Sequence, residues 1–196
     1  MTCLVRIATL VALLLLPAAS AATERAVVLD PSASEVTFTL ETTFHEVHGS
    51  LGAVAGTIHF DPATGVASGE ITVDARRADT GNRERDETMH AEVLESALFP
   101  VIRFRVERVE GNLVDPGRGE LRLVGVLNLH GADHPMTIPV ATEIVGDRVR
   151  GEFELSIPYV EWGLHDPSFF VARAAKTVDA RIRAEGRFAD ATAAAR

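Results

Sequence analysis

The sequence has almost no cysteine and no cluster of basic residues. It contains one cysteine, Cys3, and one lysine, Lys176. A single cysteine excludes an intramolecular disulfide and a cysteine-rich zinc site. The net charge is −9, and no run of basic residues occurs. This balance argues against nucleic acid and anionic membrane surfaces as partners, since both favour clustered Lys and Arg.

Motifs of common enzyme classes are also missing. The chain has no Gly-x-Ser-x-Gly elbow, no glycine-rich phosphate loop and no His-Glu-x-x-His helix. His165, Asp166 and Ser168 are close in sequence, but adjacency of this kind is not the geometry of a catalytic triad. We therefore expect no catalytic residues and no enzyme activity.

The N-terminus has the pattern of a secretory signal. An apolar run at 7–16 is followed by the small-residue site Ala19-Ser20-Ala21. The run is short for a membrane span, although an uncleaved anchor is the alternative. We predict a cleaved signal at 1–21, which includes Cys3, no integral membrane segment after cleavage, and a periplasmic or secreted protein.

The rest of the chain alternates apolar and polar residues with a period of two. One-sided strands of this kind are typical of antiparallel sheets with one wet face. About eight strands separated by short turns fit a closed barrel or a sandwich. We predict a single domain at 22–189, stabilised by its core alone, and a disordered alanine-rich tail at 190–196.

One segment breaks the alternation. Met89 and Val93 recur at helical spacing within 79–104, with Asp86 as the expected N-cap and Pro100 as the expected end of the helix. A helix with one apolar stripe must cover something, so we expect it to lie over the mouth or end of the sheet.

Four blocks in this order resemble the YceI-like, polyisoprenoid-binding proteins, and together they span nearly all of 28–187. The blocks are 38–49, 79–86 with 99–104, 125–135 and 162–170. The resemblance implies an all-β, mainly antiparallel fold: an eight-stranded lipocalin-like β-barrel with one short helix covering an end. It also implies an apolar ligand such as an isoprenoid quinone or polyprenyl lipid, with no established chemistry.

An eight-stranded barrel is either filled by its side chains or holds one small ligand. The inward-facing residues are therefore core or cavity wall, and the sequence leaves both open. Together with the helix stripe, the candidates for the cavity wall are Phe38, Leu40, Ile58, Phe60, Met89, Val93, Phe104, Val106, Leu127, Leu129, Phe153, Leu155 and Ile157.

Some candidates fall in segments that look like loops or strand ends. Four aromatic residues there either rim a ligand entrance or pack beneath the helix: Phe44, Trp162, Phe169 and Phe170. Arg83 and Arg85 either hold a polar head group beside the helix start or stabilise the turn there.

Two histidine pairs have spacings that metal sites use. They are His45 with His48, and His130 with His134. Each pair lacks a third convergent ligand, so we expect solvated loop histidines, no metal and no cofactor.

The resulting prediction is non-enzymatic binding of an isoprenoid-type lipid or amphiphile inside a secreted barrel, for transport, storage or sequestration. One alternative is a packed extracytoplasmic module that binds another protein, and a weaker one is a metal-assisted hydrolase. The expected partner is a hydrophobic small molecule, and a homodimer is possible through edge strands and rim aromatics.

Overall fold

The computed structural model describes residues 24–111 and 113–189. The predicted signal at 1–21 and the predicted tail at 190–196 lie outside these residues. Within the described part of the chain, no helix is both long and apolar enough to cross a membrane.

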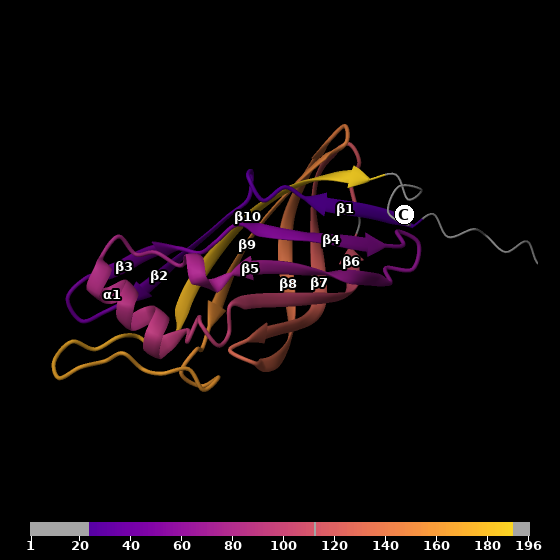
Figure 1. The fold of residues 1–196 in the computed structure, drawn as a ribbon. Helices are drawn as coiled ribbons and strands as arrows, with labels where there is room; N and C mark the ends of the chain where they lie inside the picture. The colour runs from indigo at the N-terminus through magenta and orange to yellow at the C-terminus, as the bar shows by residue number, and fades with distance from the viewer. Residues whose placement is uncertain (1–23, 112, 190–196) are drawn as a thin grey trace, which may run out of the picture.

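Nearly all of the regular structure is antiparallel sheet (Figure 1). The strands are β1 (Arg25–Leu29), β2 (Glu35–Glu41), β3 (Glu46–Ser50), β4 (Val54–Phe60), β5 (Ala67–Asp74), β6 (Val101–Gly111), β7 (Gly117–Leu129), β8 (Ala132–Val145), β9 (Arg148–Ile157) and β10 (Val178–Ala189).

The sheet closes because β10 has two partners along one edge. Its first half, Asp179–Arg183, pairs with β2, and its last residues, Gly186–Ala189, pair with β1. Since β1 also pairs with β4, the strands β1 and β4 to β10 form a ring of eight. The β2–β3 hairpin extends the wall beyond β1. The predicted eight-stranded antiparallel barrel is confirmed.

The ring is not uniform along its axis. β8 and β9 pair only between Ala141–Val145 and Arg148–Glu152. Further along, the segment after β9 packs against β8, where the Trp162 ring stacks on His134 with 3.8 Å between centroids. This end of the barrel is therefore wider than the end where β8 and β9 pair.

The helical segment lies between β5 and β6, at the end of the barrel opposite to where β10 ends (Figure 1). A 3₁₀ turn, η1 (Ala75–Arg77), precedes α1 (Arg83–Thr88), which continues into a single π-helical stretch, η2 (Met89–Val93). The predicted helix is present, and it is short.

Its predicted boundaries were wrong at both ends. Asn82, not Asp86, is the N-cap, and its side chain accepts a hydrogen bond from the Arg85 N–H at 3.1 Å. The Asp86 carboxylate instead accepts two hydrogen bonds from Thr80. The helical turns end before Glu95, whose φ of 42° reverses the chain, so Pro100 only precedes β6.

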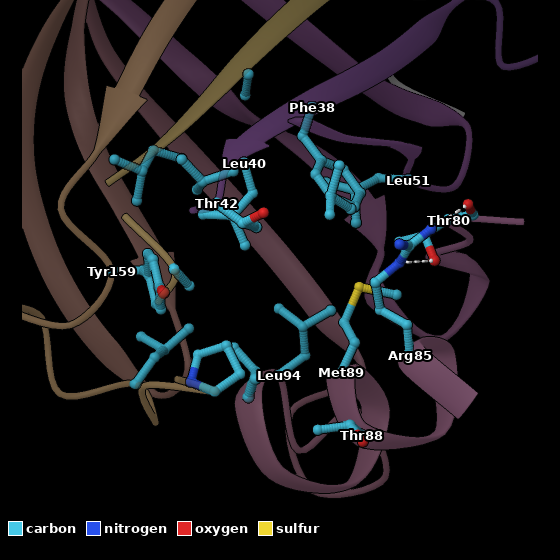
Figure 2. Close-up of a pocket in the computed structure, with 18 of the residues that line it drawn as sticks. Phe38, Leu40, Thr42, Leu51, Thr80, Arg85, Thr88, Met89, Leu94 and Tyr159 are labelled. Carbon is cyan, nitrogen blue, oxygen red and sulfur yellow. Dashed lines mark hydrogen bonds between the residues drawn. The ribbon is translucent and has the colours of Figure 1, made fainter. Parts of the chain in front are cut away.

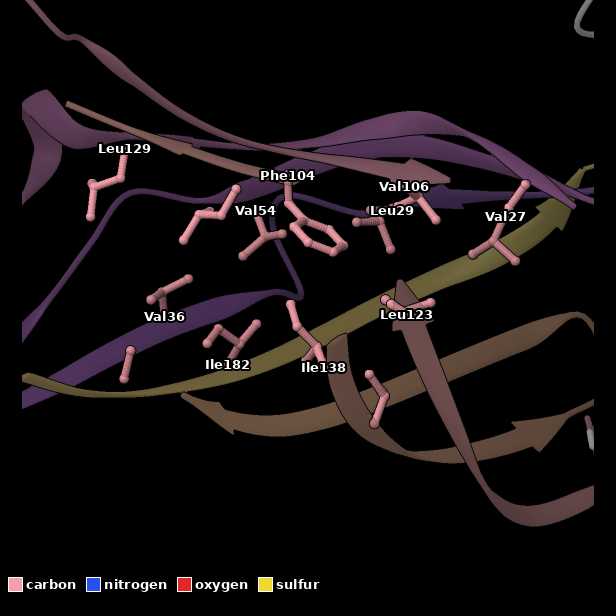
Figure 3. Packing of buried hydrophobic residues seen from close by; sticks show 14 of the residues in the cluster. Val27, Leu29, Val36, Val54, Phe104, Val106, Leu123, Leu129, Ile138 and Ile182 are labelled. Atoms are coloured by element: carbon pink, nitrogen blue, oxygen red, sulfur yellow. The ribbon is translucent and has the colours of Figure 1, made fainter. Parts of the chain in front are cut away.

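The core confirms the alternation. On β6, Phe104 and Val106 are buried, whereas Arg103 and Arg105 are exposed. The Phe104 ring lies over Gly125 of β7, where an added Cβ would be 2.9 Å from the ring. Figure 3 shows this cluster running along the inside of the barrel.

Candidate ligand-binding cavity

The wide end of the barrel contains a cavity of about 420 Å³. Strands supply one side of its wall, with Phe38 and Leu40 from β2 and Leu129 from β7. The helical segment supplies the other side, with Met89 (Figure 2) and Val93. The apolar face of the helical segment thus lies over an opening of the barrel, as the sequence predicts.

A layer of core side chains lies between the cavity and a second, smaller void inside the barrel. On β6, Ile102 lines the cavity, Phe104 and Val106 are buried, and Val109 lines a second void of about 90 Å³. Along β7, β9 and β10 as well, residues that line the cavity are followed by core residues and then by residues that line the second void. We call the layer of Phe104, Leu127, Leu155 and Ile182, one residue from each strand, the plug.

Two arginines line the cavity, Arg85 from the helical segment and Arg173 from the loop after β9. Arg85 is held by hydrogen bonds. Its Nε donates to Thr80 Oγ1 at 2.8 Å, and its Nη2 donates to the Thr80 carbonyl at 2.9 Å. Thr80 in turn donates from its backbone N–H and its hydroxyl to Asp86. Burial raises the pKa of Asp86, but the two hydrogen bonds from Thr80 and the charge of Arg85 outweigh it and lower that pKa below its ordinary value. The guanidinium is therefore held in a fixed position.

Arg83 takes a different position. Its side chain is 91% exposed and forms an ion pair with Glu87 at 2.9 Å. It does not line the cavity. Of the two predicted head-group candidates, Arg85 lines the cavity and Arg83 does not.

Tyr159 fastens the loop that follows β9. Its hydroxyl donates to the Ala175 carbonyl at 2.8 Å and so ties the start of this loop to its end. The side chain is buried in the cavity wall. Burial, aided by the negative charge of Asp166, raises the pKa of Tyr159 to about 12.

This shift gives a testable pH dependence. The chain has one tyrosine, so phenolate absorbance reports Tyr159 alone. Because the folded pKa lies above the unfolded value of about 10, the contribution to stability is complete below pH 10. It is lost as the pH rises toward the folded pKa. We expect a titration midpoint near 12 for the folded protein and near 10 in denaturant.

The Tyr159→Phe variant checks the cause of the shift. It leaves the Ala175 carbonyl without its donor, which should lower the free energy of unfolding by about 1–2 kcal/mol. A midpoint near 10 in the folded protein, with an unchanged stability of the variant, would show that the phenol is solvated.

The predicted wall residues divide between the two ends of the barrel. Those that line the cavity are Phe38, Leu40, Phe44, Met89, Val93, Leu129 and Ile157. Those that lie outside it, in the plug, elsewhere in the core or around the inner void, are Ile58, Phe60, Phe104, Val106, Leu127, Phe153 and Leu155.

The predicted rim residues also separate. Phe44 lines the cavity mouth. Trp162 packs against the core and stacks on His134. Phe169 and Phe170 lie outside the lining and are exposed, so they do not pack beneath the helix.

Several lining residues were missed. Ile102 and Val178 follow from the alternation of their strands. Tyr159 and Leu164 lie in an irregular segment with no periodic signal, although both are among the most buried residues of the core.

The histidines do not converge. His130 Nε2 lies 2.6 Å from Glu95 Oε2, whereas His134 stacks on Trp162. His48 bonds Thr39 at 3.1 Å on the outer surface. Among residues 24–111 and 113–189, no three His, Cys, Asp or Glu side chains are grouped as metal ligands would be.

His165, Asp166 and Ser168 do not form a triad either. Ser168 Oγ accepts a hydrogen bond from the Ala174 N–H, and the Asp166 carboxylate accepts from the Ser168 N–H and pairs with Lys176. His165 faces Glu92 at 3.7 Å. These contacts brace the loop after β9.

Residues 28–186 match the YceI-like domain family. The chain belongs to the YceI-like family. UPF0312 proteins of Vibrio cholerae and Shewanella denitrificans are each 31% identical to it, over 94 and 99 residues. These matches cover 47% and 49% of this chain and 48% and 49% of the relatives. The chain thus spans about half the length of the curated relatives it matches.

Solved structures share the YceI-like fold. BcnA of Burkholderia cenocepacia superposes with a TM-score of 0.68 at 16% identity, over 80% of this chain and 98% of that one. A polyisoprenoid binding domain from Saccharophagus degradans gives a TM-score of 0.65 at 15% identity, over 82% and 97%. At these identities the similarity shows the fold alone.

Proposed function

We propose that this protein binds one isoprenoid-type lipid or similar amphiphile in the cavity and releases it unchanged. The observation that carries the proposal is the unfilled, apolar interior at the wide end of the barrel. Side chains close the other end with the plug, so the space is specific to one half of the molecule.

The size and chemistry of the cavity define the ligand. A volume of 420 Å³ lies within the range of about 300–1,000 Å³ for small-molecule sites. At roughly 30 Å³ for each non-hydrogen atom, by analogy with liquid water, it holds about 14 such atoms. This equals a prenyl chain of about three isoprene units, and a longer chain must extend out of the mouth.

Polar groups at one side of the cavity orient the ligand. The Arg85 guanidinium is preorganised by Thr80, and unused N–H groups of a guanidinium bind oxygen anions well. We assign Arg85 to the oxygen-bearing head of the ligand, and Leu129 and Ile102 to its tail.

One structural neighbour supports this proposal. The Saccharophagus degradans domain is described as polyisoprenoid binding, and we extend this ligand class to the present chain. The signal-like pattern at 1–21 supports a location in the periplasm or outside the cell, where a carrier would move or sequester its ligand.

A series of prenyl alcohols tests the proposal. We expect calorimetric affinity to rise at least tenfold from geraniol to farnesol, because the added isoprene unit is buried at about 0.8 kcal/mol per carbon. We expect little further gain for geranylgeraniol, whose last unit remains outside the cavity. Binding of none of the three would contradict the proposal, and equal gains at each step would contradict the cavity length.

A further inference from the structure

Beyond the cavity, the loop after β9 presents an unusual apolar surface. Phe169, Phe170 and Val171, which we call the apolar tip, are 71%, 80% and 73% exposed. Phe44, on the turn between β2 and β3, is 68% exposed. Large apolar side chains at this exposure, gathered on neighbouring loops, are typical of a binding surface.

The apolar tip has a defined conformation. Phe169 and Ala172 exchange two backbone hydrogen bonds of 2.9 Å, which place Phe170 and Val171 at the apex of a tight turn. Phe170 has a φ of 48°, a conformation that bulky residues rarely adopt. The two phenyl rings meet edge to face with centroids 4.5 Å apart. Such a turn holds both rings out from the protein.

Backbone contacts join the tip to the cavity mouth. The Thr43 N–H donates to the Arg173 carbonyl at 2.9 Å, and the Arg173 N–H donates to Thr43 Oγ1 at 3.0 Å. Phe44, Ala172 and Arg173 themselves line the cavity. A ligand that leaves through the mouth therefore passes beside the tip.

The local charge differs in sign from that of the chain. From Phe169 to Lys176 the sequence contains two cations and no acidic residue, although the whole chain has a net charge of −9. Lys176 pairs with Asp166, whereas Arg173 forms no ion pair with any residue that the structure describes. A free guanidinium beside exposed aromatics matches the phosphate layer above a lipid interior.

The exposed area favours a bilayer over a protein partner. The side chain of a phenylalanine has a surface area of roughly 150–250 Å². At their observed exposure, Phe44, Phe169 and Phe170 together present on the order of 300–500 Å² of apolar surface. A stable protein interface buries about 800 Å² on each partner. Insertion of a few apolar side chains into a membrane surface has no such requirement.

We propose that the apolar tip and Phe44 dock the cavity mouth onto the surface of a lipid bilayer. Docking is a property of the surface, whereas transfer of ligand between bilayer and cavity rests on the function proposed above. The ligand then moves from membrane to cavity without crossing bulk water.

The test is sedimentation of the full chain with phosphatidylcholine vesicles. We expect the Phe169→Asp/Phe170→Asp variant to bind at least tenfold more weakly than the unsubstituted protein. Aspartate tolerates the left-handed conformation at position 170 better than most residues. Val145→Asp is the matched control: Val145 is 67% exposed but lies at the end of β8, at the opposite end of the barrel, so its binding should not change.

Four results of the sedimentation experiment would contradict docking. Two are that the unsubstituted protein fails to bind vesicles, and that the tip variant binds them as tightly as the unsubstituted protein does. The others are that Val145→Asp loses as much binding as the tip variant, and that inorganic phosphate competes with the vesicles. A concentration-dependent dimer that the tip variant loses, without vesicle binding, would assign the surface to a second copy of the chain.

A separate measurement keeps the two proposals apart. Phe169 and Phe170 do not line the cavity, so the tip variant should take up farnesol from solution as the unsubstituted protein does. Vesicle binding without farnesol uptake would contradict the proposed ligand and leave docking intact. Farnesol uptake without vesicle binding would do the reverse.

Discussion

Replacing Phe104 with alanine is expected to lower the free energy of unfolding by about 3–5 kcal/mol. The side chain is 6% exposed and lies over Gly125, within the core cluster. Its removal leaves a hole that a closed ring of strands cannot easily collapse to fill. Chemical denaturation monitored by circular dichroism measures the change.

The same variant should change which ligand fits. Phe104 is part of the plug between the 420 Å³ cavity and the 90 Å³ inner void. Without the Phe104 ring, less material separates the cavity from the inner void. In Phe104→Ala we therefore expect geranylgeraniol to bind more tightly than farnesol, whereas the unsubstituted protein should show no such gain. The milder Phe104→Leu variant serves if the alanine variant does not fold.

Arg105→Gln is the matched control. Arg105 is the next residue on β6 and faces solvent, and its ion pair with Glu107 at 3.7 Å is exposed. Such pairs contribute about 0–1 kcal/mol. Equal destabilisation by Arg105→Gln and Phe104→Ala would show that the inward and outward faces of β6 are misassigned.

Leu40→Asp is expected to weaken ligand binding at least 100-fold while leaving the barrel folded. Leu40 lines the cavity (Figure 2) and is only half-buried, so water can solvate a carboxylate there in the empty protein. A bound tail displaces that water and leaves an unpaired charge against hydrocarbon, which costs several kcal/mol. A 100-fold loss corresponds to about 2.8 kcal/mol.

Thr39→Asp is the control for this change. Thr39 is the preceding residue of β2, and its hydroxyl lies 3.1 Å from His48 Nδ1 on the outer face, where water can solvate a carboxylate. The Thr39→Asp variant should bind farnesol with the same affinity as the unsubstituted protein. Equal affinity of Leu40→Asp and the unsubstituted protein would place the ligand outside the cavity.

The antiparallel strands and their inward face could be predicted because they depend on local pattern, whereas the choice of a closed barrel over a sandwich came from the family resemblance. The alternation around Phe104 and Arg105 fixes which side of β6 is buried, and short turns require antiparallel neighbours. The apolar stripe of Met89 and Val93 likewise requires a surface to cover.

The division of the interior could not be predicted in this way. Phe104 and Ile102 have the same alternation, yet one belongs to the plug and the other to the cavity wall. Which of these residues faces an open space depends on where the pairing between β8 and β9 ends, and strand pairing is not visible in the local pattern. The predicted helix start was wrong for a related reason. The Asp86 carboxylate accepts two hydrogen bonds from Thr80, and the spacing of apolar residues along a helix does not predict such contacts.

Native mass spectrometry of the full chain purified from its own host tests ligand binding most directly. We predict a protein peak that carries one additional hydrophobic molecule, lost on collisional activation and absent from Leu40→Asp. A mass equal to that of the protein alone, together with no uptake of added farnesol or quinone-like lipid, would contradict the proposed function.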